Sequence, residues 1–221
     1  MKHLNFLIAL LCGSFTPTLP AQACDLALLL GVDVSGSIDP VEYRFQMQGM
    51  ADALENPAIA DALVHGQVAL SVVQWSGEGE QKVTQSWTRM LSHAAVKNFA
   101  TTIRATRREW NTSKTAIGDL IGFASGAFGP VSDCKRRVVD ISGDGQNNSG
   151  SEPAPQRALI EAHGITVNGL AIDRVGRSIT QYYLGHIITG PGAFVITATG
   201  YGDYPRAIEQ KLFREILKPA S

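Results

Sequence analysis

The chain has 221 residues, of which 44% are hydrophobic and 18% charged, and its formal net charge is −1 at pH 7. That length and apolar content predict one globular domain with enough interior to bury a core. The near-neutral charge, without a basic stripe, argues against nucleic acid as a partner.

The first 23 residues have the layout of a secretory signal peptide. Lys2 supplies a positive start, residues 4–11 form an apolar core, and residues 21–23 are a small-residue stretch before Cys24. The apolar run is broken by glycine and proline and falls short of about 20 residues, so we expect no membrane span. We predict cleavage after residue 23, a mature domain over residues 24–221, and a periplasmic or secreted location.

Two of the three cysteines, Cys24 and Cys134, remain after this cleavage. In an oxidising, exported setting an even pair suggests a disulfide, and two free buried thiols are the alternative. Lipid attachment at Cys24 is a further alternative, but the residues before it fit ordinary cleavage better than a lipobox. We therefore favour the form without a lipid.

Strand-like and helix-like segments alternate from residue 25 onward. Residues 25–32 form a continuous apolar run, as expected of a strand covered on both faces. A helix start follows, with Asp39 as an N-cap acid, Pro40 at the first helical position and Glu42 at the third. Helical spacing then continues until Asn56-Pro57, where we expect the helix to stop.

The remaining elements continue this alternation to the end of the chain. Strands over 67–75 and 82–87 are expected to form an antiparallel hairpin across the turn at 76–80. The later elements are, in chain order, a helix over 93–106, a helix from Thr115 to about 128, a strand over 136–142, a helix over 155–163, a strand over 165–172, a helix over 179–189, a strand over 194–198 and an amphipathic helix over 205–217. In the helix beginning at Thr115, Gly118, Gly122 and Gly126 share one face, which we expect to approach a sheet closely.

This order predicts an α/β fold: a doubly wound, mostly parallel central sheet with one antiparallel edge strand and helices on both faces. In such sheets the functional crevice lies beyond the carboxyl ends of the strands. Asp33, Ser35 and Ser37 directly follow the first strand, and Asp144 follows a later one in a glycine turn. Thr115 would lie beside the same crevice if the helix it begins packs on the sheet.

These five residues all supply oxygen, and none supplies nitrogen or sulfur. Oxygen ligands of this kind suit a hard cation such as Mg²⁺, whose charge two carboxylates formally balance. The three hydroxyls add neutral ligands and leave room for water or an incoming group. Asp33, Ser35 and Ser37 alone fit a turn with a helix cap equally well, but together with Thr115 and Asp144 they favour a metal site.

The same residues carry a resemblance to a known family. Residues 33–37, Asp-Val-Ser-Gly-Ser, resemble the D-x-S-x-S loop of von Willebrand factor type A domains, the integrin I-domain family. Thr115 falls where that family places its metal-site threonine, and Asp144 matches the Asp of its T-D-G turn. Gly143 stands in place of the threonine of that turn, which is not a principal ligand. The resemblance covers essentially the whole mature chain and implies a bacterial exported branch of the family.

The resemblance implies a divalent-metal-dependent adhesion site. In the family the two loop serines coordinate the metal directly, the threonine does so in the ligand-bound state, and the acids often act partly through water. A Glu or Asp of a partner protein completes the shell. For this chain it implies that Mg²⁺, Mn²⁺ or Ca²⁺ is held by Asp33, Ser35, Ser37, Thr115 and Asp144, and that the partner is an unidentified protein with an exposed Asp or Glu.

The resemblance also bears on the cysteines. It implies that the first strand lies next to, and parallel to, the strand that begins near Arg136. Cys24 and Cys134 precede these two strands, so they would lie at the same end of neighbours about 4.8 Å apart. That separation is within disulfide reach and strengthens the pairing of Cys24 with Cys134.

Two other functions stay open. No G-x-S-x-G or H-E-x-x-H motif occurs and the histidines are scattered, so we expect no enzyme. The best enzyme alternative is a metal-dependent hydrolase of the phosphatase kind. In that class the nucleophile is an aspartate at the end of a strand, as Asp33 is here, and it normally has a second acid two residues later. This chain has Ser35 at that position. A structural domain with a vestigial metal site is the third possibility.

Several polar residues near these segments are ambiguous. Asp140, inside an apolar strand, is expected to be a hydrogen-bonded structural acid, with support of a metal ligand as the alternative. Asn147 and Asn148 are expected to shape their turn, and Arg108 to belong to a solvated helix end. Arg174 follows a strand toward the same rim as the proposed ligands, and only that location recommends it.

Overall fold

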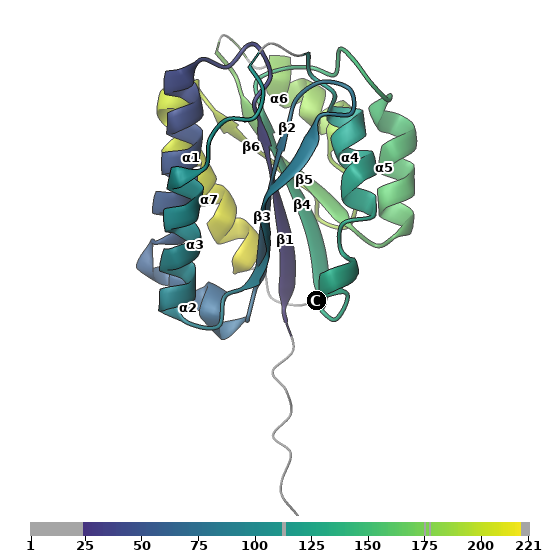
Figure 1. The fold of residues 1–221 in the computed structure, drawn as a ribbon. Helices are drawn as coiled ribbons and strands as arrows, with labels where there is room; N and C mark the ends of the chain where they lie inside the picture. Colours follow the sequence, from purple (N-terminus) through teal and green to yellow (C-terminus); the bar gives the residue numbers. More distant parts are fainter. Residues whose placement is uncertain (1–23, 112–113, 175, 177, 218–221) are drawn as a thin grey trace, which may run out of the picture.

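The structure is a computed structural model that describes residues 24–111, 114–174, 176 and 178–217, so the signal-peptide prediction for residues 1–23 lies outside the described residues. A six-stranded sheet of order β3-β2-β1-β4-β5-β6 lies between two layers of helices (Figure 1). The strands are β1 (Leu26–Asp33), β2 (Ala69–Trp75), β3 (Gln81–Arg89), β4 (Arg136–Gly143), β5 (Thr166–Ile172) and β6 (Val195–Ala198). Neighbouring strands pair in parallel except β2 and β3, which confirms the predicted fold class and its antiparallel edge strand.

The helices divide between the two faces of the sheet. They are α1 (Pro40–Leu54), α2 (Pro57–His65), α3 (His93–Ala105), α4 (Ile117–Ser125), α5 (Pro153–Ala162), α6 (Ser178–Tyr182) and α7 (Tyr204–Ile216). In Figure 1, α1, α2, α3 and α7 lie on one side of the strands and α4 and α5 on the other. Among the described residues, no helix combines the length and the apolar character that crossing a membrane requires.

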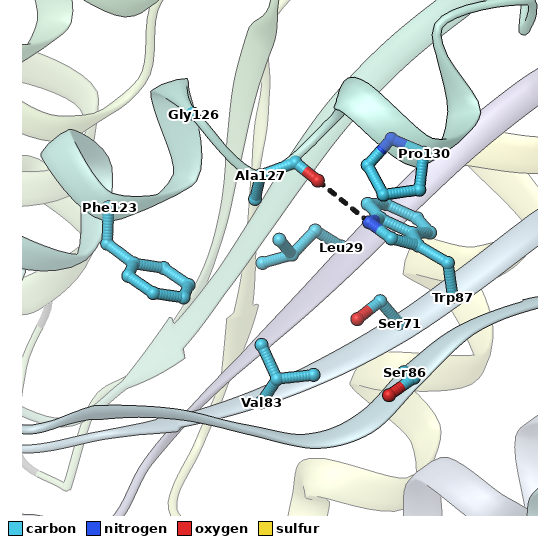
Figure 2. Close-up of a pocket in the computed structure, with 9 residues that line it drawn as sticks. All are labelled: Leu29, Ser71, Val83, Ser86, Trp87, Phe123, Gly126, Ala127 and Pro130. Carbon is cyan, nitrogen blue, oxygen red and sulfur yellow. Dashed lines mark hydrogen bonds between the residues drawn. The ribbon is translucent and has the colours of Figure 1, made fainter.

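The face of the sheet that α4 and α5 cover carries an apolar cavity of about 610 Å³ between β3 and α4. Figure 2 shows Val83 and Trp87 of β3 facing Phe123 of α4 across it, with Leu29 of β1 at its floor. The Trp87 indole N–H donates to the carbonyl of Ala127 at 2.9 Å, which holds one wall of the cavity against the end of α4. Its lining comes from β1, β2, the edge strand β3, α4 and the segment after α4, and it includes none of the five predicted metal ligands.

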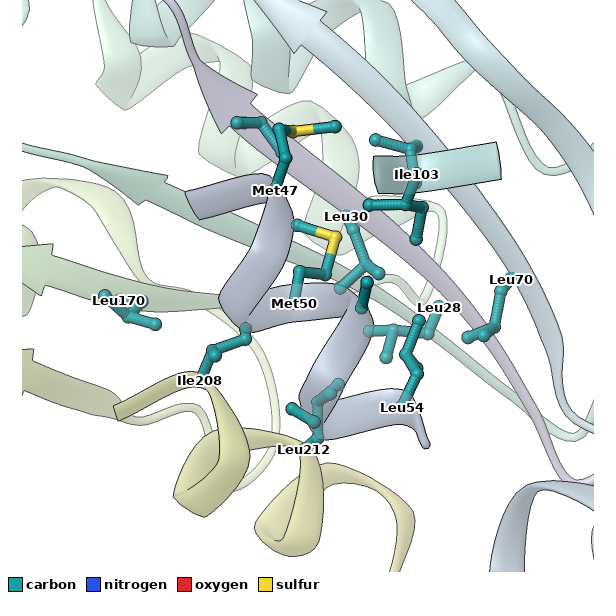
Figure 3. Close-up of a cluster of buried hydrophobic side chains, with 14 of the residues drawn as sticks. Leu28, Leu30, Met47, Met50, Leu54, Leu70, Ile103, Leu170, Ile208 and Leu212 are labelled. Carbon is teal, nitrogen blue, oxygen red and sulfur yellow. The ribbon is translucent and has the colours of Figure 1, made fainter. Parts of the chain in front are cut away.

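Alternate residues of β1 supply the two cores. All eight of its residues are buried; Leu28 and Leu30 belong to the cluster under α1 and α7, whereas Ala27 and Leu29 belong to the opposite cluster. Figure 3 shows the first cluster, in which side chains of α1 and α7 meet those of the sheet. This alternation follows from the period of two along a strand, and it explains why the sequence of β1 is apolar throughout.

Helix α2 was not expected from the sequence. Asn56-Pro57 ends α1, as predicted, but the same two residues also begin α2. The Asn56 side chain accepts hydrogen bonds from the backbone N–H groups of Ala58 and Ile59, and Pro57 occupies the first turn, where its missing N–H costs nothing. A proline after an asparagine is therefore both a stop for one helix and a start for the next.

The glycine face of α4 approaches a helix rather than the sheet, so that prediction was wrong. A Cβ at Gly118 would lie 2.0 Å from the carbonyl oxygen of Ser151, and one at Gly122 would lie 2.7 Å from Oε1 of Gln156. Both contacts belong to α5 or the segment before it. The missing side chains thus let α4 and α5 pack closely on the same face of the sheet.

The predicted disulfide joins Cys24 and Cys134, whose Cα atoms are 4.5 Å apart. The two cysteines precede β1 and β4, which pair in parallel as the family resemblance implied. The backbone N–H of Lys135 also donates to the carbonyl of Cys24 at 2.9 Å. The disulfide therefore closes the amino-terminal edge of the sheet, at the opposite end of β1 from Asp33.

Candidate metal centre

The fold brings all five predicted ligands together at the carboxyl end of the sheet. Asp33 is the last residue of β1, Ser35 and Ser37 lie in the turn after it, Asp144 follows β4, and Thr115 precedes α4. Each of these positions is set by the end of a strand or the start of a helix. The site is therefore built from three segments that are far apart in the sequence.

The side chains form one connected set of oxygens. The Thr115 hydroxyl donates to Oγ of Ser35 at 3.4 Å, and the Ser35 and Ser37 hydroxyls are 3.3 Å apart. The Ser37 hydroxyl donates to Oδ1 of Asp144 at 2.8 Å. Oδ1 of Asp33 accepts from the backbone N–H of Ser35 at 2.8 Å, which ties the acid to the turn that carries the serines.

Burial makes the charge of Asp33 costly in the absence of a cation. Asp33 is completely buried, and removal from water raises its pKa to about 7, with the nearby charge of Asp144 acting in the same direction. The hydrogen bond from the Ser35 backbone opposes this shift without overcoming it. Ser37, by contrast, is exposed, so the site opens to solvent on that side.

The residues present fit a hard divalent cation. Oδ2 of Asp33 is buried and has no hydrogen-bond partner among the described residues, which leaves a carboxyl oxygen available to a cation. Those residues contain no group of three or more His, Cys, Asp or Glu side chains able to hold a metal ion. A cation here would therefore depend on the hydroxyls of Ser35, Ser37 and Thr115 together with the two carboxylates.

Gly143, the departure from the family pattern, has a steric reason in this chain. A Cβ at that position would lie 2.8 Å from Oδ2 of Asp33 and 2.8 Å from the hydroxyl of Tyr183. Tyr183 begins the short π-helix at Tyr183–Ile187, which directly follows α6, and it is fully buried. The Tyr183 hydroxyl and the Asp33 side chain occupy the space into which a side chain at position 143 would extend, so glycine at this position leaves Asp33 in place.

The turn after β4 also holds the start of α4. Oδ1 of Asn148 accepts from the backbone N–H of Thr115 at 2.8 Å, and the Asn148 backbone N–H donates to the Thr115 carbonyl at 2.9 Å. Oδ1 of Asn147 accepts from the N–H of Gly118 at 3.1 Å. The two asparagines therefore do more than shape their own turn, because they position Thr115 against the other ligands.

Two arginines contact the site. The guanidinium of Arg108 donates to the carbonyls of Val34 at 3.0 Å and Ser35 at 2.7 Å, so its assignment to a solvated helix end was wrong. Arg174 donates to Oδ2 of Asp144 at 3.0 Å and to the carbonyl of Ser37 at 2.9 Å. No motif in the sequence marks either residue, and only the position of Arg174 after a strand pointed to the rim.

Three further residues in or near these segments, Asp173, Asp140 and Trp110, have structural partners. Asp173 accepts hydrogen bonds from the backbone N–H groups of Ile179 and Thr180 and so caps α6. Asp140 lies 3.2 Å from Nζ of buried Lys211, so its structural partner is an ion pair, and neither of its carboxylate oxygens has the expected hydrogen bond among the described residues. Trp110 is partly buried and packs against the core cluster of the first face.

We expect the metal-free protein to lose stability as the pH rises from about 5 to 7.5. The folded-state pKa of Asp33 is about 7, above its value in the unfolded chain, so the folded protein binds this proton more tightly than the unfolded chain does. The stability that the bound proton contributes is lost as the pH rises through the folded-state pKa. Thermal unfolding of wild type and Asp33→Asn in EDTA measures the effect. Subtracting the pH slope of Asp33→Asn from that of wild type removes the contributions of other groups. One of these is Asp140, because burial raises the pKa of Asp140 to about 6. Equal pH slopes for the two proteins would contradict the buried-acid account.

Comparison with known proteins identifies a family and a fold. The family model described as "Protein of unknown function (DUF1194)" matches residues 23–220. No curated protein matches the chain. Similar solved structures include proximal thread matrix protein 1 from the mussel byssus with a zinc-occupied MIDAS motif, at 18% identity and a TM-score of 0.66, covering 88% of this chain and 46% of that one.

Two bacterial structures extend this comparison. A von Willebrand factor type A protein from Catenulispora acidiphila is 16% identical with a TM-score of 0.60, covering 90% of this chain and 44% of that one. The conserved hypothetical protein BatB from Bacteroides thetaiotaomicron is 16% identical with a TM-score of 0.56, covering 88% of this chain and 100% of that one. This chain spans less than half of the mussel protein and of the Catenulispora protein. It belongs to the family described as protein of unknown function DUF1194, and its fold is that of a von Willebrand factor type A domain.

Proposed function

We propose that this protein is an exported, divalent-metal-dependent protein-binding module. Asp33, Ser35, Ser37, Thr115 and Asp144 would hold the ion, and a Glu or Asp of a partner protein would complete its shell. The observation that carries the proposal is that hydrogen bonds join all five oxygen-bearing residues into one connected set, in which buried Asp33 keeps one oxygen, Oδ2, without a hydrogen-bond partner among the described residues.

The choice of ion follows from the donor set. Oxygen ligands alone suit Mg²⁺, with Mn²⁺ or Ca²⁺ as substitutes. When bound, such an ion supplies a hard positive centre that attracts an external carboxylate. The zinc-occupied MIDAS motif of the mussel protein supports binding of a divalent ion by this fold. In this chain, exposed Ser37 lies on the side from which a partner would approach.

A binding role is favoured over catalysis by what surrounds the hydroxyls. Ser35 has the hydroxyls of Ser37 and Thr115 as its side-chain neighbours, and its hydrogen bonds in the described part of the chain involve no histidine or lysine. A serine without a base is a poor nucleophile. Export is supported by the Cys24–Cys134 disulfide, because such bonds persist in oxidising compartments.

Affinity capture from an envelope fraction tests the proposed function. We expect wild-type protein to retain a partner in Mg²⁺ and to release it in EDTA, and Asp33→Ala to retain none. Asp25→Ala is the matched control, since Asp25 lies just before the same strand at its other end and is paired with Lys135 on the surface. Capture that EDTA and Asp33→Ala leave unchanged would contradict the proposal. Asp33-dependent hydrolysis of generic phosphoesters would favour the hydrolase instead.

A further inference from the structure

Arg174 places a positive charge directly on a proposed metal ligand. Its Nη2 atom lies 3.0 Å from Oδ2 of Asp144, 3.0 Å from Oε2 of Glu42 and 2.9 Å from the carbonyl oxygen of Ser37. Both oxygens of Asp144 are thereby engaged, since Oδ1 accepts from the Ser37 hydroxyl. The Asp144 side chain is only 3% exposed, so the guanidinium is its main contact with a cation.

The rest of the guanidinium faces outward. The Arg174 side chain is 51% exposed, and its carbon Cζ lies 5.6 Å from the centre of the Tyr201 ring, which supports the group from one side. All of its hydrogen bonds to described residues come from Nη2. Within the described residues the N–H groups on Nε and Nη1 have no hydrogen-bond acceptor, and each can donate a single charge-assisted hydrogen bond to an incoming carboxylate.

We propose that Arg174 is an internal counter-ion that weakens binding of the divalent ion alone and couples its binding to the arrival of a carboxylate. This inference rests on the proposed metal-binding function. The guanidinium holds the same carboxylate that the ion requires, and its charge repels the ion. An acid bound at the exposed edge of Arg174 offsets that charge and adds a negative group beside the ion. The centre then binds metal weakly by itself and more tightly together with an acidic ligand.

Calorimetric titration with Mn²⁺ alone tests the first half of this inference. A unit charge in contact with a ligand of a divalent ion changes the affinity about tenfold even when it is screened as in water. We expect Arg174→Gln to bind Mn²⁺ about tenfold more tightly than wild type. Arg174→Lys keeps the charge and should stay close to wild type, which separates the effect of charge from that of packing. Melting temperatures in EDTA check that each variant is folded.

Arg104→Gln is the matched control. Arg104 also bridges two acids, Asp52 and Glu55, but it lies on α3 against the far end of α1. Asp52 is twelve residues along α1 from Pro40, about 18 Å from the end of the helix nearest the site. The Mn²⁺ affinity of this variant should equal that of wild type.

Acetate, used as the carboxylate probe, tests the second half. We expect it to raise the Mn²⁺ affinity of wild type and of Arg104→Gln, and to have a smaller effect on Arg174→Gln. Equal Mn²⁺ affinities for wild type and Arg174→Gln, or weaker binding by the variant, would overturn the inference while the metal site stands. Equal effects of acetate on all proteins would overturn the coupling. Absence of Mn²⁺ binding in every protein would overturn the proposed function itself.

Discussion

Replacing Lys211 by methionine is expected to lower the free energy of unfolding by about 3 to 5 kcal/mol. Lys211 lies on α7 and is completely buried; its Nζ atom is 3.2 Å from Oδ1 of Asp140 and 2.9 Å from Oε1 of Glu215. Both acids are also buried, so the substitution leaves two carboxylates in the core without their counter-charge. Denaturant titration at neutral pH measures the loss.

The pH dependence of this loss identifies its cause. Burial raises the pKa of Asp140 to about 6 although the charge of Lys211 opposes the shift. Without the lysine the pKa of Asp140 rises further, and a raised acid pKa lowers stability as the pH increases through it. The deficit of Lys211→Met should therefore be largest at neutral pH and smaller near pH 5.

Two further variants make this prediction specific. Lys82→Met removes one side of the exposed pair with Glu109 and should cost less than about 1 kcal/mol. The triple variant Asp140→Asn, Lys211→Met, Glu215→Gln removes all three charges and should recover most of the lost stability. A loss for Lys211→Met as small as that for Lys82→Met would contradict the account of the buried cluster.

Removing the disulfide with Cys24→Ala and Cys134→Ala is expected to lower the free energy of unfolding by about 4 kcal/mol. The bond joins residues 110 positions apart, and closing so long a loop restricts the unfolded chain strongly. The native strands stay paired, because Leu26 of β1 remains opposite Arg136 of β4 through the backbone. Denaturant titration of the wild type and the double variant measures the difference.

A reducing agent gives the control for this prediction. Dithiothreitol should lower the stability of wild type toward that of the double variant and should leave the variant unchanged. Metal binding should survive in both, because eight residues of strand, about 26 Å, separate the disulfide from Asp33. A double variant as stable as the oxidised wild type would contradict the prediction.

The elements that could be predicted from the sequence are those whose signal is local. Strand β1 shows itself as a buried apolar run that ends abruptly in oxygen-bearing side chains, and α1 through its capping box of Asp39 and Glu42, which is present in the structure. The mostly parallel sheet was predictable from the alternation of strands with helices, whereas the pairing of β1 with β4 was implied by the family resemblance. The start of α2 was missed because Pro57 was interpreted only as the end of the preceding helix.

The features that could not be predicted depend on contacts between distant segments. Arg108 and Arg174 reach the site from loops 74 and 137 positions away from the residues whose carbonyls they contact, and nothing beside them in sequence marks a partner. The buried partner of Asp140 is likewise on the last helix. The glycines of α4 signalled a close approach correctly, but spacing alone does not say whether the neighbour is a sheet or a helix.

The metal site itself is the central claim, and thermal unfolding in EDTA and in millimolar Mg²⁺ tests it most directly. An ion present at about a hundred times its dissociation constant stabilises the folded state by about 2.7 kcal/mol, which corresponds to a rise of roughly 5 to 10 °C in Tm for a domain of this size. We predict that rise for wild type and for Asp25→Ala, and none for Asp33→Ala. An unchanged Tm for wild type in Mg²⁺ and in Mn²⁺, or an equal rise for Asp33→Ala, would contradict the assignment of this centre.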